Sequence, residues 1–114
     1  MNSEIESIFK DFVVDGTSIP IEFLKYTGKS TTYLTYCSLG EEPLSASDDE
    51  ITDGLIQYDI DIYSKGNYLN IIKEVKKKMK ENNFMWTGDS LDMYEEDTNY
   101  YHKTVSFEKE RSVI

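Results

Sequence analysis

Two hydrophobic periods meet in IQYDIDIYSKGNYLNIIKEVKKKMKENN, residues 56–83. In the first part, apolar residues alternate with Gln57, Asp59 and Asp61, which is the period of a strand with one buried face. After a turn at residues 64–67, apolar residues recur at helical spacing and lysines cover the other sides. The stretch therefore predicts a half-buried strand followed by an amphipathic helix. The apolar stripe predicted for this helix comprises Leu69, Ile72, Val75 and Met79.

The residues before this stretch predict one helix and two strands. Ser3 and Glu6 form a capping box for a helix over residues 3–13. A strand with alternating apolar residues is expected over 19–23, and a strand rich in β-branched and aromatic residues over 31–38. Because turn residues separate these two strands, we expect them to pair antiparallel. The apolar side of the helix is predicted to comprise Ile5, Ile8, Phe9 and Phe12.

The remaining segments predict a loop, a hairpin and a tail. Residues 40–54 gather Gly, Pro, Ser and acidic side chains, which is typical of a mobile acidic loop. Residues 91–95 and 100–107 predict a closing hairpin, and residues 109–114 a frayed tail. The expected fold is one α+β domain over residues 1–114, in the order α-β-β-β-α-β-β. It has a mixed or antiparallel sheet of about four to five strands with two helices on one face.

Composition indicates which functions to set aside. The chain carries 22 acidic and 12 basic residues, a net charge of −10 that repels a phosphate backbone. We therefore expect no sequence-specific binding of nucleic acid. No apolar stretch approaches the roughly 20 residues of a membrane span, and MNSEIESIFKDF at residues 1–12 has acids where a signal peptide needs a basic start. The expectation is a protein made in the cytoplasm and not bound to a membrane.

Several residues raise the question of catalysis or metal binding. Asp59 and Asp61 point to the same side of a strand and could chelate a hard cation. His102 lies on the polar side of a predicted strand, where a hydrogen bond to a cross-strand neighbour is the favoured interpretation. Cys37 has no partner for a disulfide and is expected to be a buried structural thiol. DDEITDG at residues 48–54 is not a calcium loop, because counting Asp49 as the first ligand places Ile51 at the third position and Ile60 at the twelfth, where oxygen ligands are needed. We predict no enzyme activity, no cofactor and no metal site.

Charge is distributed unevenly along the chain. Residues 41–61 contain eight acids and no Lys or Arg, whereas residues 73–80 contain five of the twelve basic residues. A domain with an acidic stretch and a basic helix face can attract copies of itself head to tail, and such contacts can close into a ring. Two unrelated solvated surfaces are the alternative. The candidate interface comprises Lys73, Lys76, Lys77, Lys80, Glu41, Glu42, Asp48, Asp49, Glu50 and Asp53.

The chain resembles the small tail-completion or tail-terminator (head–tail joining) proteins of long-tailed bacteriophages and prophages. The resemblance is carried by YDIDIYSKGNYLNIIKEVKKKMKENNFMW at residues 58–86 and by DMYEEDTNYYHKTVSFE at residues 92–108. IPIEFLKYTGKSTTYLTYCSL at residues 19–39 fits the same order of elements. The resemblance thus spans residues 5–108. It contains no catalytic signature, because these proteins work by assembly.

The resemblance implies a structural subunit that forms a ring, typically hexameric, on the end of the tail tube. Such a ring stops tube polymerisation and joins the tail to the head. The implied partners are other copies of the chain, the tail-tube protein and head-completion or connector proteins, with assembly in the host cytoplasm and a final place in the virion tail. Such subunits are often monomeric in solution, and surplus acid around a lumen would let DNA pass without binding.

Two other functions remain open at the sequence level. The first is a small acidic binding module, such as an inhibitor that mimics DNA, although the lysine-rich helix would interrupt its acidic face. The second is a metal-dependent hydrolase that uses Asp59, Asp61 and His102. Metal titration and the assembly state of the protein would discriminate among the three.

Overall fold

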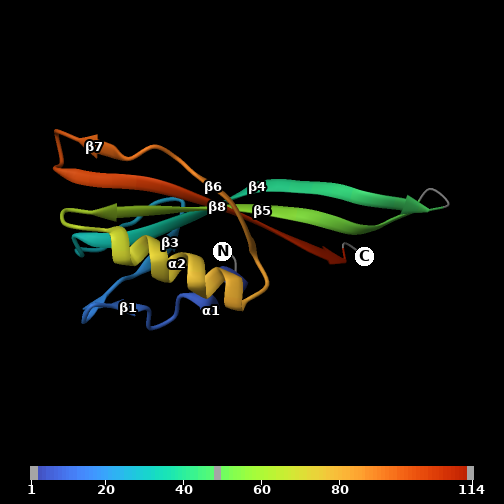
Figure 1. The fold of residues 1–114 in the computed structure, drawn as a ribbon, viewed down its shortest axis with the longest axis horizontal. Coiled ribbons are helices and arrows are strands. Elements are labelled where there is room, and N and C mark those ends of the chain that lie inside the picture. Colours follow the sequence, from blue (N-terminus) through green and yellow to red (C-terminus); the bar gives the residue numbers. More distant parts are fainter. Residues whose placement is uncertain (1–2, 48–49, 113–114) are drawn as a thin grey trace.

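The computed structural model describes residues 3–47 and 50–112, with residues 42–47, 50–53 and 111–112 described by their backbone only. The fold is α+β with two helices and a mixed sheet, as the sequence predicts (Figure 1). Over the described residues this sheet has six strands, more than the four to five predicted, and two further strands form a separate sheet, so the predicted number and order of strands are wrong. The elements are α1 (Ser3–Ile8), β1 (Val13–Val14), β2 (Thr17–Ser18), β3 (Ile21–Phe23), β4 (Thr32–Ser47), β5 (Glu50–Ser64), α2 (Leu69–Glu81), β6 (Met85–Asp89), β7 (Met93–Glu95) and β8 (Tyr100–Ser112).

The main sheet has the order β3-β4-β5-β8-β6, and β7 also pairs with β8. β3 lies parallel to β4, with Ile21 opposite Leu34, and the other pairs are antiparallel. The predicted antiparallel pairing of the first two strands is therefore wrong. The segment between them, residues 24–31, can span roughly 26–29 Å when extended, which is enough to return the chain along the short strand β3 to the start of β4. Its turn residues therefore do not close a hairpin.

The strand and helix predicted over residues 56–83 are confirmed. Ile60 and Ile62 are fully buried on the inner face of β5, and Val75 and Met79 are fully buried on α2. Leu69 departs from the predicted stripe because 66% of its surface is exposed at the start of α2. Helices α1 and α2 both contribute to one core cluster with the same sheet face, so both cover that face (Figure 1). The opposite sheet face carries no helix in the described part of the chain.

The N-terminal segment is more irregular than predicted. Helix α1 ends at Ile8, because the backbone takes a left-handed conformation at Asp11. Phe9 and Phe12 lie beyond the helix and are still buried, as their spacing predicts. Asp15 and Gly16 both have positive φ and form the turn between β1 and β2.

Residues 40–54 are not a loop where the structure describes them. β4 and β5 stay paired along this stretch, and Asp53 of β5 also pairs with Ser112 of β8. The composition misleads because β4 beyond β3 pairs only with β5 in the described part of the chain, and proline is tolerated in such an edge strand. Whether the segment is mobile stays a prediction, and residues 48 and 49 lie outside the described residues.

The C-terminal segment holds two more corrections. Residues 109–112, predicted as a frayed tail, continue β8, and residues 113 and 114 lie outside the described residues. The segment after α2 forms a strand, β6, which is absent from the predicted order of elements. The predicted hairpin of β7 and β8 is confirmed by the pairing of Tyr94 with Tyr101.

The strands extend further than the helices. In Figure 1, β4, β5 and the end of β8 project past the helical layer. We call this projection the arm and define it as residues 39–47, 50–55 and 110–112. The described core residues on β4 and β5 reach no further toward the arm than Tyr36 and Ile56.

Candidate functional site

Besides the arm, three regions of the molecule could carry function: the uncovered sheet face, a groove at the start of α2, and the basic face of α2. On the uncovered face, Asp61 accepts hydrogen bonds from His102 Nε2 at 3.0 Å and from Thr104 Oγ1 at 2.5 Å. All three side chains are partly buried. The strand register places them side by side, because Asp61 lies opposite Thr104 in the ladder of β5 and β8. His102 thus makes the cross-strand hydrogen bond that the sequence favoured.

Asp59 and Cys37 lie next to this cluster. Asp59 accepts a hydrogen bond from Ser106 Oγ at 2.6 Å and lies opposite Cys37 in the ladder of β4 and β5. The Cys37 side chain is half-buried, more accessible than the sequence predicted. Burial raises the pKa of its thiol, and the charges of Asp59 and Asp61 raise it further. The thiol therefore stays protonated at neutral pH, which is the form that does not attack electrophiles.

The two aspartates are occupied by hydroxyl and imidazole partners. Within residues 3–47 and 50–112, no group of three or more His, Cys, Asp or Glu side chains is placed to hold a metal ion. Asp61 and His102 form a pair, and Asp59 hydrogen-bonds to a serine. What this face displays is a hydrogen-bonded network across β5 and β8.

A ladder of stacked rings crosses the same face. Tyr26 stacks on Tyr33 at 4.3 Å between ring centroids, Tyr33 on Tyr63 at 4.9 Å, and Tyr63 on His102 at 4.2 Å. Sequence reasoning missed this ladder, since only strand register shows which rings are neighbours. Because neighbouring rings cover the faces of Tyr33 and Tyr63, a flat ligand would have to displace a ring in order to stack on either of them.

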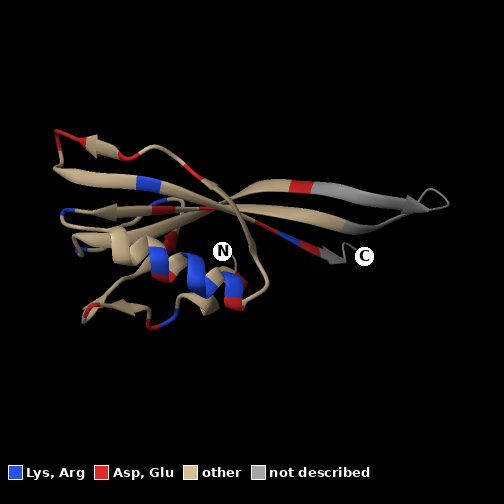
Figure 2. Cartoon of the chain, in the orientation of Figure 1, with Lys and Arg blue, Asp and Glu red and all other residues tan. Residues whose placement is uncertain are grey.

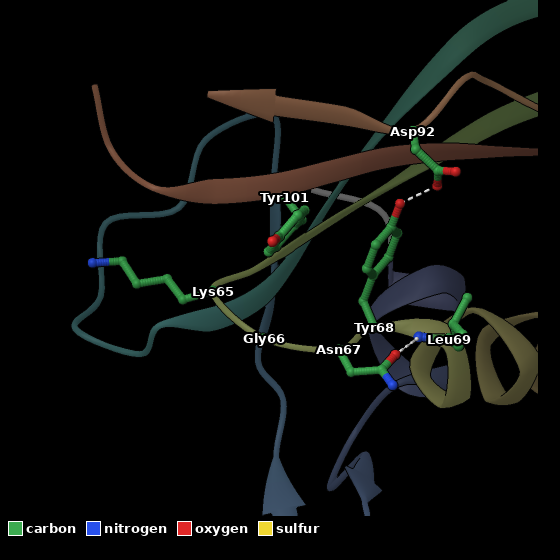
Figure 3. Close-up of a pocket in the computed structure, with 7 residues that line it drawn as sticks. All are labelled: Lys65, Gly66, Asn67, Tyr68, Leu69, Asp92 and Tyr101. Atoms are coloured by element: carbon green, nitrogen blue, oxygen red, sulfur yellow. Dashed lines mark hydrogen bonds between the residues drawn. The ribbon is translucent and has the colours of Figure 1, made fainter. Parts of the chain in front are cut away.

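A groove of about 580 Å³ opens where β5 turns into α2 (Figure 3). Tyr68 donates a hydrogen bond to Asp92, and Asn67 Oδ1 accepts one from the Leu69 backbone at 3.0 Å. Hydrogen bonds from Tyr68 and then Lys103 hold the pKa of the Asp92 carboxyl below its usual range. The groove is lined by Lys65, Gly66, Asn67, Tyr68, Leu69, Asp92 and Tyr101. The groove carries both a positive and a negative side chain, so it does not favour a partner of one charge over the other.

The basic face of α2 holds the lysines predicted for an interface (Figure 2). Lys73, Lys77 and Lys80 are exposed, and none of them makes an ion pair in the described part of the chain. Lys76 differs, because its Nζ lies 3.1 Å from Asp89 Oδ2 and 4.2 Å from the centroid of the Trp86 ring. The first three cations are free to meet an external partner.

The predicted acidic half of the interface is described only in part. Glu41 is exposed on β4. Glu42, Glu50 and Asp53 lie in strands whose side chains are outside the description, and Asp48 and Asp49 lie outside the described residues altogether. Among the described side chains, no ion pair joins Glu41 to the lysines of α2.

Sequence reasoning also missed an apolar surface beside these lysines. Met85 and Trp86 of β6 are 65% and 51% exposed, and Trp86 Nε1 donates a hydrogen bond to Asp89 at 2.8 Å. The signal in the sequence is FMW, three large apolar residues directly after the predicted helix. Only Phe84 of that triplet is buried.

Two further observations bear on function. No helix in the described part of the chain is both long enough and apolar enough to cross a membrane. No protein-family model and no curated protein matches the sequence. The observations that bear on function are therefore the surfaces described above.

Proposed function

We propose that this chain is a structural subunit of a phage or prophage tail, which caps the tail tube as a ring and forms the joint to the head. The observation that carries the proposal is the arm. In the described part of the chain, no helix covers this half of the sheet (Figure 1). A sheet buries an apolar face by packing against another layer, so an uncovered extension is suited to packing on a neighbour.

The sheet edges support a ring-like assembly. The main sheet ends in β3 on one side and in β6 on the other, and these strands differ in length, sequence and direction of pairing. A contact that joins two different surfaces is head to tail and closes into a ring when the rotation between subunits allows. The partners are then other copies of the chain, the tail-tube protein and the head-completion or connector proteins. Assembly takes place in the host cytoplasm, and the ring stays in the virion tail.

The net charge fits a ring through which DNA passes. At −10 per subunit, a lumen lined by this chain repels a phosphate backbone and does not hold it. Weak contacts between subunits, strengthened by a tail-tube end that presents several sites at once, account for monomers in solution and rings on the tube.

Electron microscopy of the purified chain mixed with the tail-tube protein of its own phage or prophage tests this function. Tubes of limited length with a ring at one end are expected, while the same tube protein alone should polymerise without such caps. A reversed-charge variant of a distant tip, Asp97→Lys, provides a matched control and should cap normally. Uncapped tubes at saturating concentrations of folded chain would contradict the proposal.

A further inference from the structure

We propose that a groove between α2 and β6 receives the exposed side chains Leu39 and Glu41 of a second copy of this chain. The groove measures about 610 Å³ and is lined by Lys76, Lys80, Asn83, Phe84, Met85 and Trp86. This contact deepens the proposed ring and rests on it.

The apolar floor of the groove belongs to an edge strand. β6 is the last strand of the sheet order and pairs with β8 alone. Met85 and Trp86 leave more than half of their surface in water, although Phe84 beside them is buried. Exposed apolar side chains that gather along a sheet edge mark a surface suited to a protein partner.

The positive charge at the rim of the groove favours a partner with negative charge. Lys80 is exposed and unpaired among the described residues, and Lys73 and Lys77 continue the positive face along α2 (Figure 2). Residues 73–80 hold five of the twelve basic residues but one of the 22 acidic residues. The rest of the chain therefore holds 21 acidic and seven basic residues. A second copy can thus present an acidic surface that is complementary in charge to this rim.

The opposite side of the sheet offers a fitting projection. β3 pairs with β4 only as far as Tyr36, so the outer edge of β4 beyond it has no strand partner in the described part of the chain. A register shift between Ser38 and Gly40 makes Leu39 the extra residue of a bulge, and it is 54% exposed. Glu41 follows two residues later and is also exposed. An apolar side chain with an acid beside it matches an apolar floor with a lysine rim.

Bulges decide how the two surfaces meet. β6 has its own register shift, between Trp86 and Gly88, and Gly88 has φ +151°. Bulges on both edges interrupt the flat row of backbone groups that strand addition requires. The contact is therefore made by side chains, with Leu39 on Met85 and Trp86 and with Glu41 near Lys80. Because β5 and β8 lie between β4 and β6, the projection of one subunit serves the groove of the next.

Site-directed disulfide formation tests the contact without any tail tube. In a Cys37→Ser background, one batch carries Leu39→Cys and a second carries Met85→Cys. A disulfide needs Cα atoms within about 7 Å, so mild oxidation of the mixture should yield predominantly mixed dimers. A chain with both substitutions should give a ladder of covalent oligomers. Leu91→Cys, at a position 85% exposed, replaces Leu39→Cys as the matched control and should give several-fold less mixed dimer.

Charge reversal separates this contact from chance collision. Adding Glu41→Lys to the first batch should lower the yield of mixed dimer several-fold, and adding Lys80→Glu to the second batch should restore it. Thermal unfolding of each variant confirms that it is folded. Mixed dimers no more abundant than with Leu91→Cys, or insensitive to both reversals, would overturn the contact. Capped tubes combined with absent cross-links would reject the contact alone, whereas cross-links without capping would reject the tail function alone.

Discussion

Asp61 concentrates the polar interactions of the uncovered face on one carboxylate. It accepts hydrogen bonds from His102 and from Thr104, both from β8, while it belongs to β5. Hydrogen bonds to a charged acceptor are stronger than neutral ones, and a partly buried donor that loses its acceptor is costly. This residue therefore stabilises the pairing of the two central strands.

Asp61→Asn should lower the free energy of unfolding by about 1–2 kcal/mol, because the amide keeps the shape but loses the charge. Urea denaturation at neutral pH measures the change. Asp97→Asn, in the exposed turn between β7 and β8, is the matched control and should change stability by less than about 0.5 kcal/mol. Equal stability of the Asp61 variant and the wild type would show that the network adds nothing.

Tyr63 gives the ring ladder a dependence on alkaline pH. Burial, followed by the charge of Asp61, raises the pKa of Tyr63 to about 12. An unfolded tyrosine titrates near 10, so the neutral phenol contributes stability that is complete below about pH 10 and is lost as pH rises through 12. Denaturant midpoints between about pH 9 and about pH 11.5 should therefore fall for the wild type.

Tyr63→Phe should make this decline shallower, since it removes one of the three described tyrosines whose pKa is raised, Tyr33, Tyr63 and Tyr68. Tyr68, whose pKa is also raised to about 12 by burial and by its hydrogen bond to Asp92, preserves part of it. Tyr101→Phe, on an exposed ring, should keep the wild-type slope. An identical slope in the Tyr63 variant would mean that this phenol titrates equally in both states.

Helix α2 shows what local pattern can and cannot predict about an element. The spacing of Ile72, Val75 and Met79 correctly predicted the buried side. Leu69 fits the same spacing but lies in the first turn of α2, beside the open groove of Figure 3, where no layer covers it. Periodicity gives the direction of a side chain, and only the extent of the neighbouring layer decides whether it is buried.

Met79→Ala should destabilise the protein by about 2–5 kcal/mol, because it empties a fully enclosed site between α2 and the sheet. Leu69→Ala removes a similar side chain from the same helix and should change stability by less than about 0.5 kcal/mol. Thermal or urea unfolding of the two variants in parallel distinguishes them. Comparable losses would place Leu69 in the core.

The elements that sequence could not predict share a physical cause. β5 was evident because Ile60 and its neighbours alternate with acids, and the alternation needs no knowledge of the partner strand. The arm was missed because its Gly, Pro, Ser and acidic residues are typical of a loop, and because the pairing of β5 with β8 there joins residues more than 50 apart in sequence, such as Asp53 and Ser112. The contact of Asp61 with His102 was open for the same reason. The sequence shows which residue types each strand carries, but it does not show the strand register that makes two of them neighbours.

The whole molecule is longer than its chain length requires. Its principal extents are 53, 27 and 24 Å, and its radius of gyration is 15.5 Å, whereas a compact domain of this length has roughly 13 Å. The arm accounts for the difference, because it extends the sheet beyond the helices (Figure 1). An elongated subunit can contact neighbours at two distant places, as a ring requires.

Replacing residues 43–54 with Asn-Gly joins Glu42 to Leu55, which are already opposite one another, and should leave the core intact. The variant should unfold cooperatively and have a smaller radius of gyration by small-angle X-ray scattering. Under the proposed function, it should fail to cap tail tubes. A shortened chain that caps as well as the wild type would remove the arm from the assembly.

The place of β8 in the sheet affects how the protein is made. β8 follows β5, β6 and β7 in the chain, yet it lies between β5 and β6 in the sheet and also pairs with β7. Until residues 100–112 emerge from the ribosome, β6 has nothing to pair with and the inner edge of β5 is open. Lys109 then reaches Glu4 at 2.8 Å and ties the last strand to the first helix. Chains that are still being translated therefore lack the completed groove between α2 and β6. Translation thus delays the proposed contact between copies until each chain can fold completely.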